Sequence, residues 1–418
     1  MNPILELGEC IPDVEARVFG DRIYLYGSMD ILGNEEYCSR EYYAFCSDDF
    51  VHWEKSGLLL DAENEEFKRV FGKGMLYAPD CIEKDGKYFL FFCMEDGAEG
   101  VAVSDLPTGP FQKPKLIGGI DRDGIDPSIF IDDDGTPYYF WGQFHLRGAK
   151  MDGSMEHIIE GTKQEWLLTE EEHGFHEGAS LRKYNGMYYM LYTDISGGRA
   201  TRISYAVSDA PLGPYTKKGV IVDNTGCDPQ TWNNHGSMQN IFGKWYIFYH
   251  RSSQNSKFNR RVCVEPIAFD GNGNIRTVEM SLGGQEREVP ASRKIEAGRF
   301  SSAGSGAYSF TKNIEEGCIY GVRGTREGSW CQYQSLRFQK ESSFRITLGN
   351  QKGGGKIEIR LGGRQGKVIG TVVILSENRE GPMEITVPVE PAEGIFPLTL
   401  CFLGDEGGLF EMWDFCFL

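Results

Sequence analysis

The sequence contains no hydrophobic run long enough to cross a membrane, for which about 18–20 consecutive apolar residues are needed. This argues against a membrane-spanning helix and predicts no membrane partner. The first residues, MNPILELGECIPD, also have neither the basic start nor the apolar stretch of a secretory signal peptide. We therefore expect a cytoplasmic protein.

Positive charge is in short supply. The 418 residues include 61 Asp and Glu against 43 Lys and Arg, which gives a formal net charge of −18 at pH 7. An acidic surface of this kind repels phosphate backbones, so we expect no nucleic-acid partner.

Signals for cysteine pairing are missing as well. The 11 cysteines are scattered along the chain, odd in number, and include no C-x-x-C pair. This pattern predicts reduced cysteines that act as small core residues rather than a disulfide framework.

Aromatic residues and glycine are abundant instead, at 13% of the chain and 53 residues respectively. This combination favours short β-strands joined by tight turns over long helices. A chain of 418 residues is also too long for one small domain and suggests two or three.

An aromatic strand preceded by a turn glycine recurs five times. The copies are GDRIYLYGS, DGKYFLFFC, DGTPYYFWG, NGMYYMLYT and FGKWYIFYH, with their glycines at Gly20, Gly86, Gly135, Gly186 and Gly243. A short strand that opens on a polar residue precedes each copy, and these residues are Asp13, Asp80, Asp126, Glu177 and His235. Five units of roughly 50 residues with several strands each predict a five-bladed β-propeller over residues 1–290. The alternative is a β-sandwich or two stacked all-β domains.

In a propeller the inner strands of all blades line one central channel, so residues at the same end of these strands meet at one mouth. We therefore expect Asp13, Asp126 and Glu177 to share a pocket. Carboxyl groups in one pocket repel, at least one pKa rises, and a proton donor then lies beside an ionised acceptor. Glycoside hydrolysis needs such a pair. Taken singly, Asp126 before Pro127 could simply open a turn, and Asp80 could simply start a strand.

Aromatic side chains that could stack on sugar rings lie near these acids in the sequence. They are Trp53, Tyr77, Trp141, Phe175 and Trp232.

The order IPD, IDPSIF, HEGASLRKYNGMYYMLY and HGS…WYIFYH, together with the AVSDxPxGP segments, resembles glycoside hydrolase family 43 over residues 5 to about 285. The resemblance implies a five-bladed propeller that inverts the anomeric configuration. By matching motif, Asp13 would be the general base, Glu177 the general acid, and Asp126 the residue that tunes the pKa of the acid.

The same resemblance implies that His235 lies on the channel axis, where it could help to hold a structural calcium ion through water; no other cofactor is expected. An arginine of NRRVCVEP would contact substrate, either Arg260 or Arg261, with the spacing favouring Arg260. The predicted substrate-binding residues are Tyr77, Asp80, Trp141, Phe175, His235 and Arg260.

Two positions depart from the family pattern. The first motif usually continues with proline after the base, whereas Asp13-Val14-Glu15 stands here, and Glu15 would share a strand face with Asp13 and could compete as the base. The second blade carries Asp80 where many members have glutamate, which could change a substrate contact.

Residues 291–418 differ in character and alternate polar and apolar residues, as in KIEIRLGG and VIGTVVIL, which predicts an antiparallel β-sandwich. The segment resembles a family 6-type carbohydrate-binding module. That likeness suggests Trp330 and Tyr333 as a sugar-binding pair, with a core position as the alternative for Trp330. It also suggests Glu296 and Asp414 as what remains of a calcium site. The module could bind glycan or could brace the propeller.

The sequence thus predicts an inverting glycoside hydrolase that acts on arabinose- or xylose-containing plant oligosaccharides. A galactose-active member, a retaining sucrose-type hydrolase and a non-catalytic glycan-binding propeller are the alternatives. The oligomeric state is left open.

Overall fold

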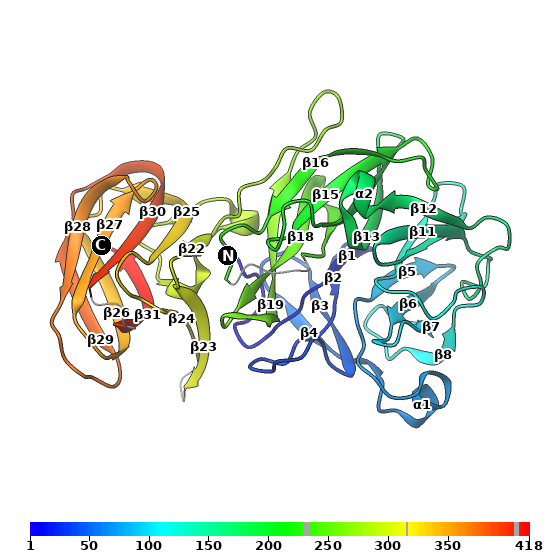
Figure 1. The fold of residues 1–418 in the computed structure, drawn as a ribbon, viewed down its shortest axis with the longest axis horizontal. Coiled ribbons are helices and arrows are strands. Elements are labelled where there is room, and N and C mark those ends of the chain that lie inside the picture. Colours follow the sequence, from blue (N-terminus) through cyan, green and yellow to red (C-terminus); the bar gives the residue numbers. More distant parts are fainter. Residues whose placement is uncertain (229–233, 315–316, 405–408) are drawn as a thin grey trace.

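The structure is a computed structural model that describes residues 1–228, 234–314, 317–404 and 409–418. Figure 1 shows two β-rich units side by side, with the N-terminus at their junction. Within the described residues, no helix is long and apolar enough to cross a membrane. All eleven cysteines are free thiols, and nine of them are buried.

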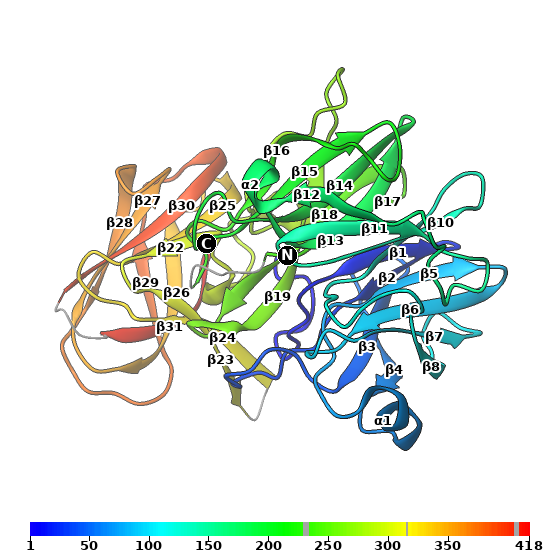
Figure 2. The ribbon, with the colours of Figure 1, turned by 45° about the vertical axis from the view of Figure 1, so that its right-hand side comes forward.

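The first unit consists of sheets arranged around a central axis (Figure 2). In the described part of the chain, four sheets have four strands and one has three. The sheets are β1 (Glu15–Phe19), β2 (Arg22–Tyr26), β3 (Glu41–Ser47) and β4 (Glu54–Asp61); β5 (Asp80–Lys84), β6 (Lys87–Cys93), β7 (Glu99–Ser104) and β8 (Gln112–Leu116); β9 (Ser128–Ile131), β10 (Pro137–Trp141), β11 (His145–Lys150) and β12 (Gln164–Thr169); β13 (Phe175–Tyr184), β14 (Met187–Asp194), β15 (Arg202–Ser208) and β16 (Thr216–Asp223); and β17 (Ser237–Ile241), β18 (Lys244–Ser253) and β19 (Ser256–Ile267). Helix α1 (Glu65–Phe71) precedes β5, and α2 (Glu170–His173) precedes β13.

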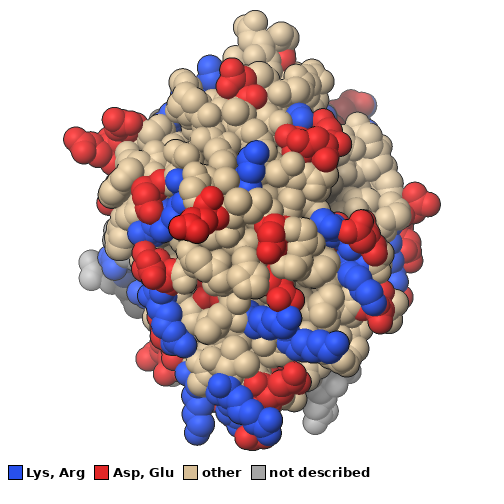
Figure 3. Space-filling model, turned by 90° about the vertical axis from the view of Figure 1, so that its right-hand side faces the viewer, with Lys and Arg blue, Asp and Glu red and all other residues tan. Residues whose placement is uncertain are grey.

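The innermost strands close a ring, because β1 contacts β5, β5 contacts β9, β9 contacts β13, β13 contacts β17, and β17 contacts β1. The predicted five-bladed propeller is confirmed. The aromatic strand of each repeat is the second strand of its blade, and β10 is buried along its whole length because neighbouring blades pack against both of its faces. Acidic and basic side chains are interspersed on the propeller face seen in Figure 3.

The second unit is a sandwich of two sheets, which confirms the predicted all-β architecture. One sheet runs β20-β25-β30-β27-β28 with β22 against β25, and the other runs β23-β24-β31-β26-β29 with β21 against β31. Their strands are β20 (Val289–Pro290), β21 (Ile295–Glu296), β22 (Ser302–Gly304), β23 (Tyr308–Ile314), β24 (Gly317–Arg323), β25 (Trp330–Gln339), β26 (Ser343–Gln351), β27 (Gly355–Leu361), β28 (Lys367–Ile374), β29 (Met383–Pro388), β30 (Glu393–Gly404) and β31 (Phe410–Phe417); the 3-10 helices η1 (Gly284–Glu286) and η2 (Ala297–Arg299) lie before and between them.

The predicted sugar-binding pair of the sandwich is wrong. Tyr333 is fully buried and donates its hydroxyl to the carbonyl of Ala297, so it is a core residue. Trp330 is half-buried beneath the guanidinium of Arg364, 5.4 Å from the ring centroid. The acids suggested as calcium ligands pair with cations instead, Glu296 with Arg299 and Asp414 with Lys294.

The sandwich is joined to the fifth blade by buried polar contacts. Arg251 at the end of β18 donates to the carbonyls of Phe300 (2.8 Å) and Ser301 (3.3 Å). The guanidinium of Arg261 lies 4.9 Å from the ring centroid of Tyr320. Because these contacts are buried and directional, they fix the sandwich on the last blade.

The N-terminal segment completes that last blade. The amide of Ile4 donates to Val262 of β19, and the side chain of Asn2 donates to the carbonyl of Val264 and the carboxylate of Glu265 while accepting from the amide of Val264. The guanidinium of Arg299, from the sandwich, donates to the carbonyl of Pro3 at 2.7 Å. The first residues of the chain therefore lie along the edge of β19 and tie the first blade to the fifth.

This closure predicts that Asn2→Ala destabilises the protein. The substitution leaves the buried amide of Val264 without its partner and removes one of three hydrogen bonds to Oε1 of Glu265, so the free energy of unfolding should fall by about 2–3 kcal/mol in urea titrations of the full chain. Asn272→Ala, at an exposed turn, is the matched control and should have no effect. Equal stability of both variants and the wild type would show that the segment does not close the ring.

Candidate active site

A pocket of about 160 Å³ opens at one mouth of the propeller channel. It is lined by Asp13, Tyr37, Cys38, Tyr77, Ala78, Ile125, Asp126, Gln143, Glu177 and Arg260. The structure therefore brings together the three acids that the repeat placed in phase. It also brings Tyr77 and Arg260 to the same pocket, as expected.

The backbone aims the acids at the axis. Asp13 and Asp126 each lie two residues before their inner strands and have positive φ angles of 57° and 55°. This left-handed conformation costs a non-glycine residue on the order of 1 kcal/mol or more, so its repetition at equivalent positions indicates a functional constraint.

The third acid, Glu177, reaches the pocket by a different local structure. It lies at a register shift in β13, beside Gly178 with φ of 69°. A Cβ atom at position 178 would lie 2.8 Å from the hydroxyl of Thr193 and 3.0 Å from the ring of His235. Glycine is therefore required for Glu177 to take this position.

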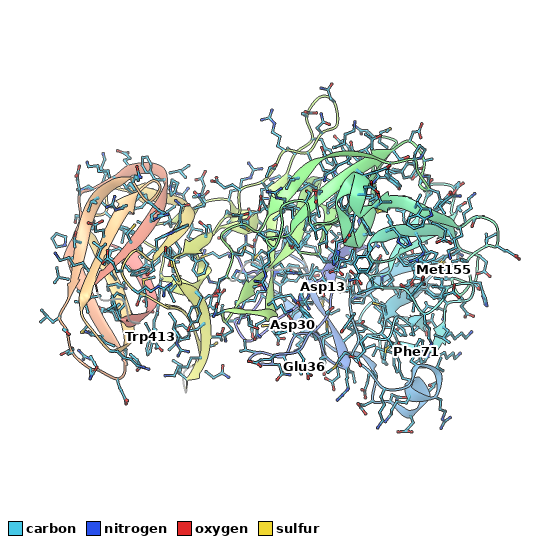
Figure 4. The ribbon with its side chains drawn as sticks, in the orientation of Figure 1. Asp13, Asp30, Glu36, Phe71, Met155 and Trp413 are labelled. Carbon is cyan, nitrogen blue, oxygen red and sulfur yellow. The ribbon has the colours of Figure 1, made fainter. Side chains whose placement is uncertain are left out.

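Asp13 is held by a buried network. Arg260 donates from Nη1 to Oδ1 of Asp13 at 3.0 Å, and Ser28 donates to Oδ2 at 2.7 Å. Arg260 is itself clamped by Asp30, with Nε–Oδ2 and Nη2–Oδ1 distances of 2.9 Å. Figure 4 shows Asp13 and Asp30 close together near the centre of the propeller. Burial acts to raise the pKa of Asp13, but the Arg260 guanidinium, His250, His235 and the Ser28 hydroxyl together outweigh burial and keep that pKa below its usual value.

Asp126 is in the opposite electrostatic situation. Burial, followed by the negative charges of Glu177 and Asp13, raises the pKa of Asp126 well above its usual value. Asp126 therefore holds a proton to a higher pH than an ordinary aspartic acid. The amide of Gln143 donates to Oε2 of Glu177 at 2.8 Å and orients that carboxyl group, whose Oε1 accepts no such bond from Gln143.

His235 lies beside the acids rather than in the pocket wall. Its side chain is buried, and Nδ1 lies 3.6 Å from Oδ2 of Asp126 with no hydrogen-bond partner among the described residues. The described residues contain no group of three or more His, Cys, Asp or Glu side chains that could hold a metal ion. Direct calcium coordination by six to eight oxygens therefore does not fit this part of the chain.

The channel below the pocket is filled by two arginine–carboxylate pairs. Arg17 donates from Nη2 to both oxygens of Asp80, at 2.7 and 2.6 Å, and Arg182 donates to Glu15 at 2.7 Å. Asp80 is fully buried and Glu15 nearly so, and neither lines the pocket. The expectation that Asp80 contacts substrate is therefore wrong, and Glu15 is placed away from the reacting region.

Asp80 lies deeper because it is the first residue of β5, whereas Asp13 and Asp126 precede their strands by two residues. Ala78 holds the equivalent position in the second blade and lines the pocket. In the second blade the polar residue of the repeat therefore lies two positions further along the chain than in the first and third blades.

Two of the proposed stacking aromatics are core residues. Trp141 and Phe175 have no exposed surface and pack in clusters between blades, so the structure contradicts their assignment to substrate binding. Trp53 packs against Phe50, and Trp232 lies outside the described residues.

Tyr37, Cys38 and Gln143 line the pocket but were not predicted. They come from connecting loops, which follow no repeat.

Sequence comparison agrees with this geometry. The profile of Glycosyl hydrolases family 43 matches residues 1–275, and that of Carbohydrate binding module (family 6) matches residues 296–417. A xylosidase/arabinosidase of Thermoclostridium stercorarium is 30% identical over 334 residues, which cover 69% of each chain.

Solved structures give the same picture. A family 43 β-xylosidase/α-arabinofuranosidase from a compost metagenome, in complex with xylotriose and in a calcium-free form, aligns with 66% of this chain and 97% of its own, with 30% identity and a TM-score of 0.58. A Bacillus subtilis arabinoxylan arabinofuranohydrolase in complex with cellotetraose has the same fold over all of this chain and 97% of its own, with 24% identity and a TM-score of 0.58.

The two protonation environments predict opposite effects on stability. The pKa of Asp126 is raised on folding, so the stability that this residue contributes is present below pH about 4 and is lost as the pH rises. Asp126→Asn should therefore stabilise the protein at pH 7 by about 1–3 kcal/mol, and by less at pH 4. The pKa of Asp13 is lowered on folding, so its contribution is present above pH about 4 and is lost as the pH falls. Asp13→Asn should therefore destabilise the protein at pH 7.

Thermal melts of both variants at pH 4 and pH 7 check this sign reversal. Loss of stability in both variants at pH 7 would contradict the raised pKa assigned to Asp126.

Proposed function

This chain belongs to glycosyl hydrolase family 43 and is a glycoside hydrolase, and we propose that it releases arabinose or xylose units from short plant oligosaccharides with inversion at the anomeric carbon. The observation that supports the proposal most strongly is the meeting of three carboxyl groups in one pocket, where the pKa of Asp13 is lowered and that of Asp126 is raised. An ionised acceptor and a proton donor in one site are the requirement of this chemistry.

In this proposal Asp13 is the general base. Its oxygens accept from Arg260 and Ser28, and each oxygen keeps a lone pair for a water molecule. Asp13 removes a proton from that water as the water oxygen attacks the anomeric carbon. Because the pKa of Asp13 is low, the carboxylate is ionised over the neutral and mildly acidic range.

Glu177 is the general acid. It transfers its proton to the departing glycosidic oxygen as the bond to the anomeric carbon breaks. Asp126, whose pKa is raised, lies beside Glu177 and orients it. Arg260 and Tyr77 lie in the pocket wall, where they can contact the sugar hydroxyls.

The size of the pocket favours a single sugar ring. At about 160 Å³ it is well below the roughly 300–1,000 Å³ of sites that enclose larger ligands. The pocket therefore suits removal of one terminal or branching unit rather than cleavage within a bound polymer. The pentose assignment follows the relatives, one named a xylosidase/arabinosidase and another solved with xylotriose.

We assign calcium no step in this reaction. One related structure is described as a calcium-free form, but the described residues here do not form a direct calcium site. Any cation near His235 would be held through water.

The two catalytic variants should respond differently to the leaving group. Glu177→Gln should lower kcat on unactivated pentose disaccharides by roughly 10²–10⁴-fold, because the leaving alkoxide then departs without a proton. Its loss on a dinitrophenyl pentoside should be much smaller, because that leaving group needs no proton. Asp13→Asn should lower kcat on both substrates, because both need an activated water.

The substrates to compare are aryl α-L-arabinofuranoside, β-D-xyloside, β-D-galactoside and α-L-arabinopyranoside, assayed with wild type and both variants. Release of a pentose that Asp13→Asn abolishes supports the proposal. Release of galactose alone would replace the pentose assignment with a galactose one. Equal loss on both leaving groups in Glu177→Gln would remove Glu177 as the acid.

A further inference from the structure

An exposed aromatic residue, Phe144, directly follows the pocket-lining residue Gln143 and has a strained backbone conformation. Phe144 is 55% exposed and has φ of 66°, which is a true outlier for a bulky side chain. Its amide donates to the carbonyl of His176 at 2.7 Å, and its carbonyl accepts from the amide of Glu170 at 3.1 Å. The loop therefore holds the phenyl ring of Phe144 at one fixed place in solvent, at a cost in backbone conformational energy.

This ring is tied to the general acid from both sides. The preceding residue, Gln143, donates to Glu177, and His176 precedes Glu177 in the chain. The ring of His176 meets that of Phe144 edge to face, with centroids 5.3 Å apart. Phe144 and Glu177 are thus parts of one rigid unit at the pocket mouth.

A second exposed ring extends the same surface. Trp166 on β12 is 69% exposed and lies over His145, with ring centroids 4.2 Å apart, and His145 follows Phe144 in the chain. Exposed aromatic rings of this kind can stack on the apolar faces of sugar rings. Stacking buries apolar surface, and the rigid aromatic side chain loses little conformational entropy.

The position of the acid decides which part of the substrate lies here. The acid must face the leaving oxygen, so the sugar beyond the scissile bond leaves the pocket on the Glu177 side. The larger open cleft of about 600 Å³ is lined mainly by residues 33–35 and 254–259, and its Asn259 precedes Arg260, which contacts Asp13. Arg199, which follows β14 of the blade that carries Glu177, lines the cleft as well. Phe144 is joined to the Glu177 segment and is therefore on the leaving-group side.

We propose that Phe144 is the stacking platform for the first sugar of the leaving group and that Trp166 contacts the sugar after it, so that this glycosidase prefers oligosaccharides over disaccharides. The inference rests on the proposed function, since it takes Glu177 as the acid. It names the substrate class more narrowly: pentose units attached to a chain of at least two further sugars.

The test compares kcat/KM on a di-, tri- and tetrasaccharide series of the preferred pentose. Phe144→Ala should lower kcat/KM on all of them by about three- to tenfold, as expected for the loss of one aromatic stack, and Phe144→Trp should restore it. Trp166→Ala should leave the disaccharide unchanged and lower kcat/KM on the longer substrates. The inhibition constant of the free pentose, which fills only the pocket, should stay the same in every variant.

The chain offers a close control. Phe242 is also exposed (60%) and has a positive φ of 50°, but it lies in the turn between β17 and β18, at the end of β17 away from the pocket. Phe242→Ala should match the wild type on every substrate. Arg199→Ala tests the cleft and should also match it.

Unchanged kcat/KM in Phe144→Ala, or a loss in Arg199→Ala instead, would overturn the proposal. A rise in the inhibition constant of the free pentose in Phe144→Ala would show a structural role and would also overturn it. Hydrolysis of an aryl pentoside by the wild type is the control for the proposed function. If the wild type hydrolyses it, the outcomes above concern Phe144 alone; if it does not, the proposed function itself fails.

Discussion

The ion triad of Asp13, Arg260 and Asp30 is the interaction on which the site depends. A carboxylate buried at the channel mouth would normally take up a proton, because burial penalises its charge. Arg260, together with His250, His235 and Ser28, prevents this for Asp13, and Asp30 holds Arg260 in place with three hydrogen bonds. Burial and the negative charges of Glu177 and Asp13 act in the opposite direction on Asp126 and raise its pKa. One pocket therefore contains one carboxyl group with a lowered pKa and one with a raised pKa.

The propeller makes this contrast possible by geometry. The closed ring places the first and fifth blades side by side, so Asp13, before inner strand β1, touches Arg260 on β19, although the two residues are 247 positions apart in the chain. The two arginine–carboxylate pairs in the channel link strands β1, β5 and β13 below the pocket. Residues 2–4 then close the ring on β19, and Arg299 of the sandwich holds that closure. In this structure the sandwich is joined to the propeller by direct buried contacts and not only by the connecting chain.

The sequence predicted the fold and the central acids because both follow from one repeat. Asp13, Asp126 and Glu177 could be found since equivalent positions of a propeller converge. The substrate-binding prediction for Asp80 failed because of a shift of two residues along the strand. Asp80 is the first residue of β5, as Glu15 is of β1, so it lies in the channel beside Glu15 and not in the pocket beside Asp13. The substrate-binding prediction also failed for Trp141 and Phe175, because blades pack on both faces and bury strand aromatics completely. Gln143 and Phe144 come from a loop whose path depends on contacts with the next blade, and such contacts have no pattern in the sequence.

The most direct measurement is the configuration of the first sugar released, followed by proton NMR within the first minutes of hydrolysis. If Asp13 activates a water and does not attack the sugar itself, the anomeric signal that appears first is that of the inverted product, and the other anomer grows later by mutarotation. A first-formed product with the configuration of the substrate would mean a covalent intermediate. That result would contradict the role assigned to the Arg260-clamped Asp13.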